Sequence, residues 1–327
     1  MTLNKNDVSP EQLGHYTLLE RVGDGSLGPA FRARDTVLGR TVLVRNVDER
    51  FRGEPVVRAH LIEQARAAAA VSHPNVARLF EVGEGPDELF LVFEFVSGQT
   101  LDEARGGQPL GVRQTVALGV QLADALGAGH AKGVLHLDVR PSTIMLSRRG
   151  HAKLLDLGLG TWAARTPLSS TSGSADEAAG GTGGDWYQSP EQRGGDPLDG
   201  RSDLFSLGQV LHEMVTGRAP VGADGHQTAP RPSEVNAEIP TELEQIVGRA
   251  TAPRAADRYQ SAAPMAAELR SLAAILDVRS GDQEPPTHVA VAALESGQRF
   301  ARNPWLIVAA AVAVLAAAVW FWLSPRG

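Results

Sequence analysis

The first hundred residues alternate apolar and polar side chains in short runs separated by glycine-bearing turns. Runs at 16–22, 30–34 and 41–47 show this period, and 88–96 is an almost continuous apolar run. Because successive side chains of a strand point to opposite faces, the first three runs predict half-buried strands and the fourth predicts a buried one. The alanine-rich run 55–71 predicts a helix between them.

Helical spacing dominates the chain from residue 112 to about residue 276. Apolar residues recur three and four positions apart over 112–132, as expected for one face of a helix. Strands first and helices afterwards predict an α+β protein of two lobes, not alternating βαβ units. We expect an N-terminal tail at 1–14, then one domain at 15–276 with a β-rich lobe at 15–97 and a helical lobe at 98–276.

The C-terminal part has a different pattern. Residues 277–303 contain a Ser-Gly and a Pro-Pro pair and predict a flexible linker. Residues 305–323 are 19 apolar residues without a charge, with tryptophans at both ends. As a helix they would extend about 29 Å, close to the thickness of a bilayer core, and the tryptophans suit its two interfaces. The alternative is a buried terminal helix of a soluble domain.

The membrane interpretation predicts a transmembrane helix at 304–323 and an external tail at 324–327. Arg299 and Arg302 flank the helix on its N-terminal side and Arg326 follows it, a small bias that places the domain on the cytoplasmic side of the inner cell membrane. Alanines recur at four-residue intervals in the helix, a spacing that allows close approach of two such helices. A membrane-associated homodimer is therefore one alternative to a monomeric anchor.

Composition narrows the choice of partners. The net charge of −7 offers no basic surplus to neutralise phosphates, so we expect no nucleic-acid partner. The absence of cysteine excludes disulfides and thiolate metal sites, which fits a reducing cytoplasm. Lysine occurs only at Lys5, Lys132 and Lys153.

Two short motifs indicate the chemistry. His-Leu-Asp at 136–138 and Asp-Leu-Gly at 156–158 resemble the H-R-D and D-F-G motifs of the bacterial serine/threonine protein kinase family. The resemblance implies that Asp138 accepts the proton of a substrate hydroxyl and that Asp156 holds Mg²⁺ on the phosphates of ATP.

Other motifs extend the resemblance over about 15–276. Ser-Pro-Glu at 189–191 is similar to the family's A-P-E motif, which implies that Glu191 pairs with Arg258. Gly23, Gly25 and Gly28 resemble the glycine-rich loop, whose backbone N–H groups close over the phosphates of a nucleotide.

The resemblance also implies four contacts to the nucleotide base, at Ala30, Leu43, Glu94 and Val96. Ala30 stands where the family usually has valine, and Leu43 stands where it has alanine. The additional carbons of Leu43 crowd the adenine pocket, and overpacking of this kind costs about 1–3 kcal/mol.

The phosphate-binding lysine of the family is Arg45 here, and no lysine lies between Lys5 and Lys132 to replace it. Arginine keeps the charge but is longer and planar. The family's partner glutamate falls on Gln64, which can form a hydrogen bond with Arg45 but no ion pair. We therefore expect Arg45 to lack a carboxylate partner.

The catalytic loop departs from the family at three further positions. Arg140 replaces lysine, Leu137 replaces arginine, and Thr143 replaces the asparagine that would hold a second metal ion. A threonine hydroxyl is a poorer and shorter ligand for Mg²⁺ than an amide oxygen. The resemblance thus assigns catalytic roles to Asp138, Arg140 and Arg45 and metal binding to Asp156 and Thr143.

These departures favour a pseudokinase, a kinase-like domain that acts as scaffold or regulator for an unidentified protein partner. We expect weak binding of ATP and Mg²⁺. Two alternatives stay open: a weakly active serine/threonine kinase, and a module that responds to nucleotide without transferring phosphate.

Overall fold

The computed structural model of the chain describes residues 12–25, 27–85, 88–159, 185–219 and 230–280. Contacts divide the chain into two units, Met1–His288 and Val289–Gly327, and every described residue belongs to the first. The predicted membrane helix at 304–323 lies outside the described residues, as does nearly all of the linker. Within the described part of the chain, no helix has the length and apolar character needed to span a bilayer.

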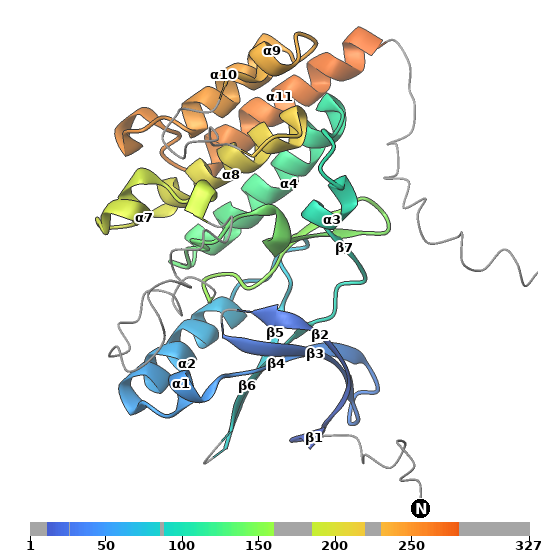
Figure 1. Cartoon of the computed structure of the whole chain (residues 1–327), viewed down its shortest axis with the longest axis vertical. Helices are drawn as coiled ribbons and strands as arrows, with labels where there is room; N and C mark the ends of the chain where they lie inside the picture. The colour runs from blue at the N-terminus through green and yellow to red at the C-terminus, as the bar shows by residue number, and fades with distance from the viewer. Residues whose placement is uncertain (1–11, 26, 86–87, 160–184, 220–229, 281–327) are drawn as a thin grey trace, which may run out of the picture. The chain divides into compact units, whose positions relative to one another are not determined.

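The first lobe is built on an antiparallel sheet of six strands (Figure 1). In their order across the sheet these are β1 (Gln12–Leu13), β2 (Tyr16–Gly25), β3 (Gly28–Asp35), β4 (Thr41–Asn46), β6 (Leu89–Glu94) and β5 (Leu79–Glu84). Val42 and Val44 of β4 lie in a buried cluster on one face. Leu43 packs against the cluster on the other face, where residues of α2 (Pro55–Ala69) join it. Arg45 shares this second face, since side chains alternate along a strand.

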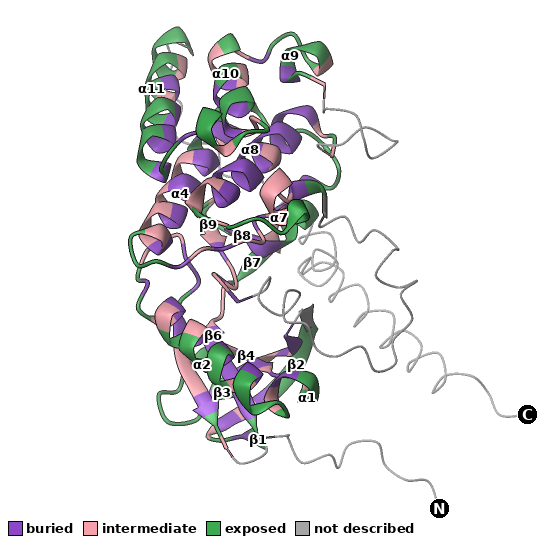
Figure 2. Ribbon diagram, turned by 90° about the vertical axis from the view of Figure 1, so that its left-hand side faces the viewer, coloured by how far each residue is buried: buried purple, intermediate pink, exposed green. Residues whose placement is uncertain are grey.

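The second lobe is mainly helical. Its helices are α3 (Leu101–Arg105), α4 (Val112–His130), α7 (Pro190–Gly194), α8 (Gly200–Thr216), α9 (Pro232–Val235), α10 (Thr241–Ala250) and α11 (Ala262–Ser280). Helix α4 packs against both α8 and α11, and α10 packs on α8. Buried residues, purple in Figure 2, are most frequent in α4 and α8, so these two helices form the centre of the lobe.

A small antiparallel sheet of three strands belongs to the second lobe. Its strands β7 (Gly98–Thr100), β8 (Ile144–Ser147) and β9 (Ala152–Leu154) lie in sequence order. The short helix η1 (Pro141–Thr143) leads directly into β8. Strands β8 and β9 lie between Asp138 and Asp156 along the chain, so this sheet fixes the segment that connects the two acidic residues.

Local sequence explains where several of these helices begin. Thr100 and Glu103 form reciprocal hydrogen bonds at the start of α3, and Ser189 and Gln192 do the same for α7. Each pair satisfies two backbone N–H groups that have no partner within the helix. Helix α8 is capped at its C-terminal end by Gly217, whose φ of 71° lies in the left-handed region that glycine adopts without strain.

The predicted two-lobed α+β fold is confirmed. Two predicted boundaries differ slightly, because α2 ends at Ala69 and α11 continues to Ser280, past the expected start of the linker at 277. The short elements β5, α3 and α1 (Glu49–Arg52) were not predicted, nor was the three-stranded sheet. The strands of the three-stranded sheet have three or four residues each, too few to show a period.

Candidate active site

The catalytic loop contains a strained backbone. Among the described residues, the non-glycine residues with positive φ are Leu137, at 59°, and Asp156, at 52°. Such a conformation costs about 1–3 kcal/mol and persists only where the surroundings enforce it. The N–H of Leu137 donates to Oδ1 of Asp203 at 2.6 Å, and its carbonyl accepts from Nε2 of Gln192 at 3.0 Å. Both backbone groups of Leu137 are thus held.

Asp203 is the centre of this support. It lies fully buried on α8 and accepts a second hydrogen bond, from the N–H of His136, at 2.8 Å. Nε2 of His130 lies 2.7 Å from Oδ2 of Asp203, the oxygen atom that also accepts from His136. We did not predict this role from the sequence. The available signal was an acidic residue within an apolar helical pattern, because a buried carboxylate needs several partners.

Asp138 lies beside Arg140, as their shared loop requires. Nε of Arg140 donates to Oδ1 of Asp138 at 2.9 Å, and the Asp138 side chain is 25 % exposed. Burial raises the pKa of the Asp138 carboxyl above its ordinary value, against the opposing effect of the charge on Arg140. A carboxylate with this environment can accept a proton from a hydroxyl placed next to it.

The hydroxyl of Thr143 has a different task from the predicted one. It donates to the carbonyl oxygen of Asp138 at 2.7 Å, and it accepts from the N–H of Arg140 at 3.2 Å. Thr143 is buried, with 7 % exposure. Its hydroxyl therefore connects two backbone groups of the catalytic loop. The metal-binding role assigned to Thr143 stays a prediction.

Arg45 has a carboxylate partner after all. Its Nη2 donates to Oδ2 of Asp156 at 2.6 Å, and the two side chains are 8 % and 22 % exposed. The expectation that Arg45 lacks such a partner is wrong, because the long arginine side chain reaches Asp156, which follows it by 111 residues. In the described residues Arg45 bonds to Asp156, while Glu63, the neighbour of Gln64, points outward and lies 3.7 Å from His60.

This arrangement does not fit a divalent metal ion. Asp156 is paired with Arg45, Asp138 is paired with Arg140, and the Thr143 hydroxyl bonds within its own loop. Within the ranges that the structure describes, no group of three His, Asp or Glu side chains could hold a metal. Magnesium prefers an octahedron of oxygen ligands, and here one oxygen of each carboxylate and the Thr143 hydroxyl already have partners.

The glycine-rich loop is a tight hairpin fixed at its tip. Gly25 pairs with Gly28 across the turn, and Leu27 is buried in the cluster on the α2 side of the sheet. The carbonyl of Leu27 accepts from the N–H of Asp48 at 2.9 Å. Gly28 has a φ of 131°, and a Cβ there would lie 2.2 Å from the carbonyl oxygen of Asn46, so only glycine fits.

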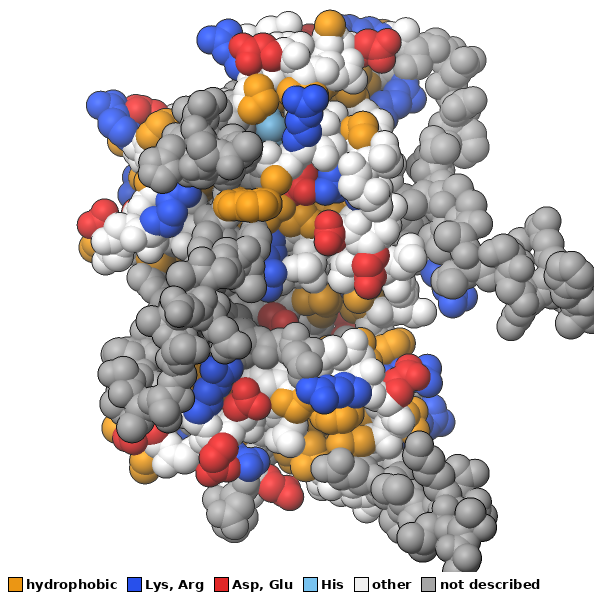
Figure 3. Space-filling view, in the orientation of Figure 1, with side chains coloured by type: hydrophobic (Ala, Val, Ile, Leu, Met, Phe, Trp, Pro, Cys, Tyr) orange, Lys and Arg blue, Asp and Glu red, His pale blue; other side chains and the backbone are white. Residues whose placement is uncertain are grey.

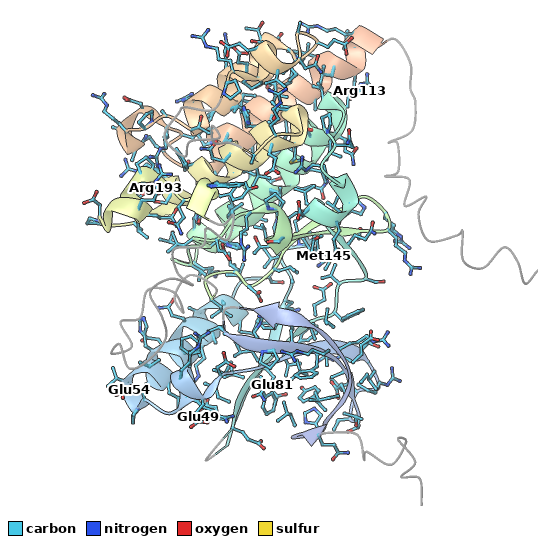
Figure 4. The ribbon with its side chains drawn as sticks, viewed as in Figure 1. Glu49, Glu54, Glu81, Arg113, Met145 and Arg193 are labelled. Carbon is cyan, nitrogen blue, oxygen red and sulfur yellow. The ribbon has the colours of Figure 1, made fainter. Side chains whose placement is uncertain are left out.

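The predicted base contacts lie on three strands and the segment after β6. Ala30 pairs with Arg45 across β3 and β4, and Glu94 ends β6, followed by the half-buried Val96. The Glu94 carboxylate accepts from Nζ of Lys153 at 2.9 Å. We did not predict this ion pair, which connects β6 of the first lobe to β9 of the second. Met145, labelled in Figure 4, pairs with Lys153 on the adjacent strand β8.

The predicted pair of Glu191 and Arg258 is present. The guanidinium of Arg258 is fully buried and donates to both carboxylate oxygens of Glu191, at 2.6 and 2.9 Å. Burial raises the pKa of Glu191, but the hydrogen bonds from Arg258 and Ser202 outweigh this effect and lower it to about 2. The pair joins α7 to the segment before α11.

Comparisons with known proteins agree with this geometry. The chain is 32% identical over 269 residues to a probable serine/threonine-protein kinase of Clostridium perfringens, covering 79% of this chain and 38% of that protein. It is 34% identical over 265 residues to the serine/threonine-protein kinase PknH of Mycobacterium tuberculosis, covering 77% and 41%. The chain thus spans about two fifths of the length of these curated relatives.

A solved structure shows the same fold. The crystal structure of the Mycobacterium tuberculosis PknI kinase domain matches with a TM-score of 0.64 at 21% identity, covering 81% of this chain and 98% of that domain. The family model described as protein kinase domain matches residues 16–269. The chain therefore belongs to the protein kinase domain family.

Proposed function

We propose that the chain is a membrane-anchored pseudokinase that acts as a scaffold or regulator. Its relatives are named serine/threonine-protein kinases, and the family uses ATP and Mg²⁺. The proposal separates the fold, which follows the family, from phosphoryl transfer, which we expect to be slow or absent.

The observation that supports this proposal is the ion pair between Arg45 and Asp156. Phosphoryl transfer depends on a positioned γ-phosphate and on neutralisation of its charge. The two groups that the family uses for these tasks are bonded to each other here, at 2.6 Å. To act on a nucleotide, Arg45 and Asp156 would each have to give up this short, shielded ion pair and form a contact with the nucleotide or its metal instead.

A second candidate is a slow serine/threonine kinase, and Asp138 is the observation that favours it. Asp138 is present, partly exposed and supported by a strained loop that Asp203 and Gln192 hold in place. Strain of this kind is typical of functional sites. A carboxylate so placed can still accept a hydroxyl proton.

Phosphorylation assays separate the two candidates. The purified 327-residue chain is compared with Asp138→Asn and Asp156→Asn variants, using labelled ATP and a generic basic protein substrate. We expect the signal of the parent to lie little above that of the variants. Strong phosphorylation that both substitutions abolish would overturn the pseudokinase proposal. Equal phosphorylation by all three proteins would indicate a contaminating kinase.

The apolar run at 305–323 supports a membrane anchor, with the kinase-like domain in the cytoplasm. We propose that binding partners are proteins and not nucleic acids. On the face shown in Figure 3, Lys and Arg side chains are interspersed with Asp and Glu, in keeping with the net charge of −7. Dimerisation through the anchor is a further part of the proposal.

Cell fractionation tests the anchor. The chain is expected in the membrane fraction, and a shortened form that ends at His288 is expected in the soluble fraction. A shortened form that stays with the membrane would show that the anchor assignment is wrong. Cross-linking of the two forms at equal concentration then tests whether the C-terminal segment promotes dimers.

A further inference from the structure

The charge balance around Asp156 leaves little attraction for a metal ion. The carboxylate is already neutralised by Arg45 at 2.6 Å, and the pair is mostly shielded from water. Screening by solvent is weak at such positions, so the guanidinium repels a second cation that approaches the same carboxylate. A divalent ion at Asp156 would have to share the carboxylate with the guanidinium or displace it.

The remaining oxygens of the site do not compensate. Oδ1 of Asp138 accepts from Arg140 at 2.9 Å, and the Thr143 hydroxyl is bonded to the carbonyl of Asp138 at 2.7 Å. A metal held by these groups would therefore compete with the Arg45 and Arg140 guanidinium groups for both carboxylates and would have to take the Thr143 hydroxyl from its own loop. The oxygen atoms of Asp138, Thr143 and Asp156 therefore do not suit the Mg²⁺ ion that the kinase family uses.

Arg45 still has donors to offer. A guanidinium carries five N–H groups, and the bond to Asp156 uses one of them. Its Nε is buried and has no hydrogen-bond partner among the described residues, which costs about 1–3 kcal/mol for an unsatisfied buried donor. Planar guanidinium groups bind phosphate oxygens through two parallel hydrogen bonds. A phosphate is thus the ligand that suits Arg45.

We infer that this site binds a nucleoside triphosphate without a divalent metal, with the Arg45 guanidinium as its resident cation. Asp156 holds the guanidinium in place, and the phosphates take its remaining N–H groups. The inference rests on the proposed function, since it assumes that the kinase-like domain keeps a nucleotide site. It goes further in stating the form in which the nucleotide is bound.

Calorimetric titration of the 327-residue chain with ATP tests the inference, once with EDTA and once with excess magnesium chloride. We expect the two dissociation constants to agree within about threefold, less than 1 kcal/mol. Affinity about tenfold or more tighter with magnesium would overturn the inference. Failure to bind ATP in either condition would overturn it as well, but would leave the proposed scaffold role intact. Strong phosphoryl transfer would refute the proposed function instead.

Manganese provides a readout that does not depend on nucleotide. The electron paramagnetic resonance signal of aqueous Mn²⁺ is lost when the ion binds protein. Added to the nucleotide-free chain, Mn²⁺ should keep its full aqueous signal. Loss of one equivalent of that signal, and its return in the Asp156→Asn variant, would place a metal at Asp156 and refute the inference.

Three substitutions complete the test. Arg45→Ala should weaken ATP binding in EDTA by about tenfold or more, since the resident cation is lost. Arg45→Lys keeps the charge on a shorter side chain and should make binding depend on magnesium. Arg66→Ala is the matched control, because Arg66 is 71% exposed on α2 and pairs with Glu84. Unchanged metal-free binding in Arg45→Ala, with thermal unfolding showing an intact fold, would contradict the inference.

Discussion

The catalytic loop and strand β4 contribute to the same site, but the structure supports them differently. The loop is held by the buried Asp203, which accepts hydrogen bonds from two successive backbone N–H groups of the loop. Gln192 donates to a backbone carbonyl of the same loop. Strand β4 presents Arg45, whose hydrogen bond within the described residues goes to Asp156, the predicted metal ligand. The loop is thus supported by buried groups of the second lobe, whereas Arg45, which would contact the phosphates, departs from the family motif and is bonded to a carboxylate. A kinase fold can therefore keep its internal supports after its phosphate-binding groups have changed.

The largest expected effect is in the support of the loop. Asp203→Ala leaves the N–H groups of His136 and Leu137 without their acceptor, and His130 without its partner. We expect a loss of about 3–5 kcal/mol of unfolding free energy, measured by urea denaturation. Asp124→Ala is the control, because its pair with Arg270 is exposed and should contribute less than about 1 kcal/mol. Equal effects of the two substitutions would mean that Asp203 does not have the supporting role we assign to it.

The pair of Glu191 and Arg258 should be nearly as important and should depend on pH. Folding lowers the pKa of Glu191 from 4.5 to about 2. Its contribution of about 2–3 kcal/mol is thus present above pH 4.5 and is lost as the pH falls towards 2. Glu191→Gln should remove this part of the acid dependence. Denaturation at several pH values checks it, and an unchanged slope would contradict the lowered pKa.

A smaller effect is expected where β4 meets the nucleotide. Leu43 is half-buried and packs against a cluster that includes Phe93 and Leu159. Leu43→Ala combined with Arg45→Lys should tighten ATP binding in the presence of magnesium by about tenfold, since it removes bulk and restores a compact charge. Calorimetry measures this change. Leu19→Ala, at a position 52% exposed on β2, is the control and should have no effect. Low-micromolar binding by the parent would already contradict the crowding argument.

The smallest effect should come from Thr143. Thr143→Val removes the hydroxyl that bonds to Asp138 and Arg140 and should cost about 1 kcal/mol of unfolding free energy. Thr143→Asn should cost less, because an amide can make both bonds. Thermal unfolding of the two variants distinguishes a structural role from a metal-binding one. A Thr143→Val variant as stable as the parent would show that the hydroxyl does not hold the loop.

The sequence predicted the lobes well, because long runs with a period of two or 3.6 residues report which side chains are buried. The pair of Glu191 and Arg258 was also accessible through resemblance to the family. The partner of Arg45 was not. Position in a motif says which strand a side chain leaves from, but the reach of a guanidinium to a residue 111 positions away depends on how the chain packs.

Leu27 is a second residue whose environment could not be predicted from the local sequence. The tip of a glycine-rich loop is expected to lie in solvent, yet this leucine is 2 % exposed and belongs to the core of the first lobe. Nothing in the local pattern distinguishes it from an exposed turn residue. Its burial follows from the position of the turn above α2, which the sequence pattern alone does not fix.

The buried Leu27 also has a thermodynamic consequence for any ligand that requires the hairpin tip to open. Opening breaks the bond from Asp48 and exposes the leucine, whose burial is worth about 1.5–3 kcal/mol. Fewer than about one molecule in ten would then have an open hairpin at equilibrium, and the apparent affinity would be lower than the intrinsic affinity by about tenfold or more. A partner protein that stabilised the open form would raise nucleotide affinity by the same factor, and nucleotide would strengthen the partner's binding equally. Nucleotide and partner protein would thus be coupled, because both would bind the form of the chain in which the hairpin is open.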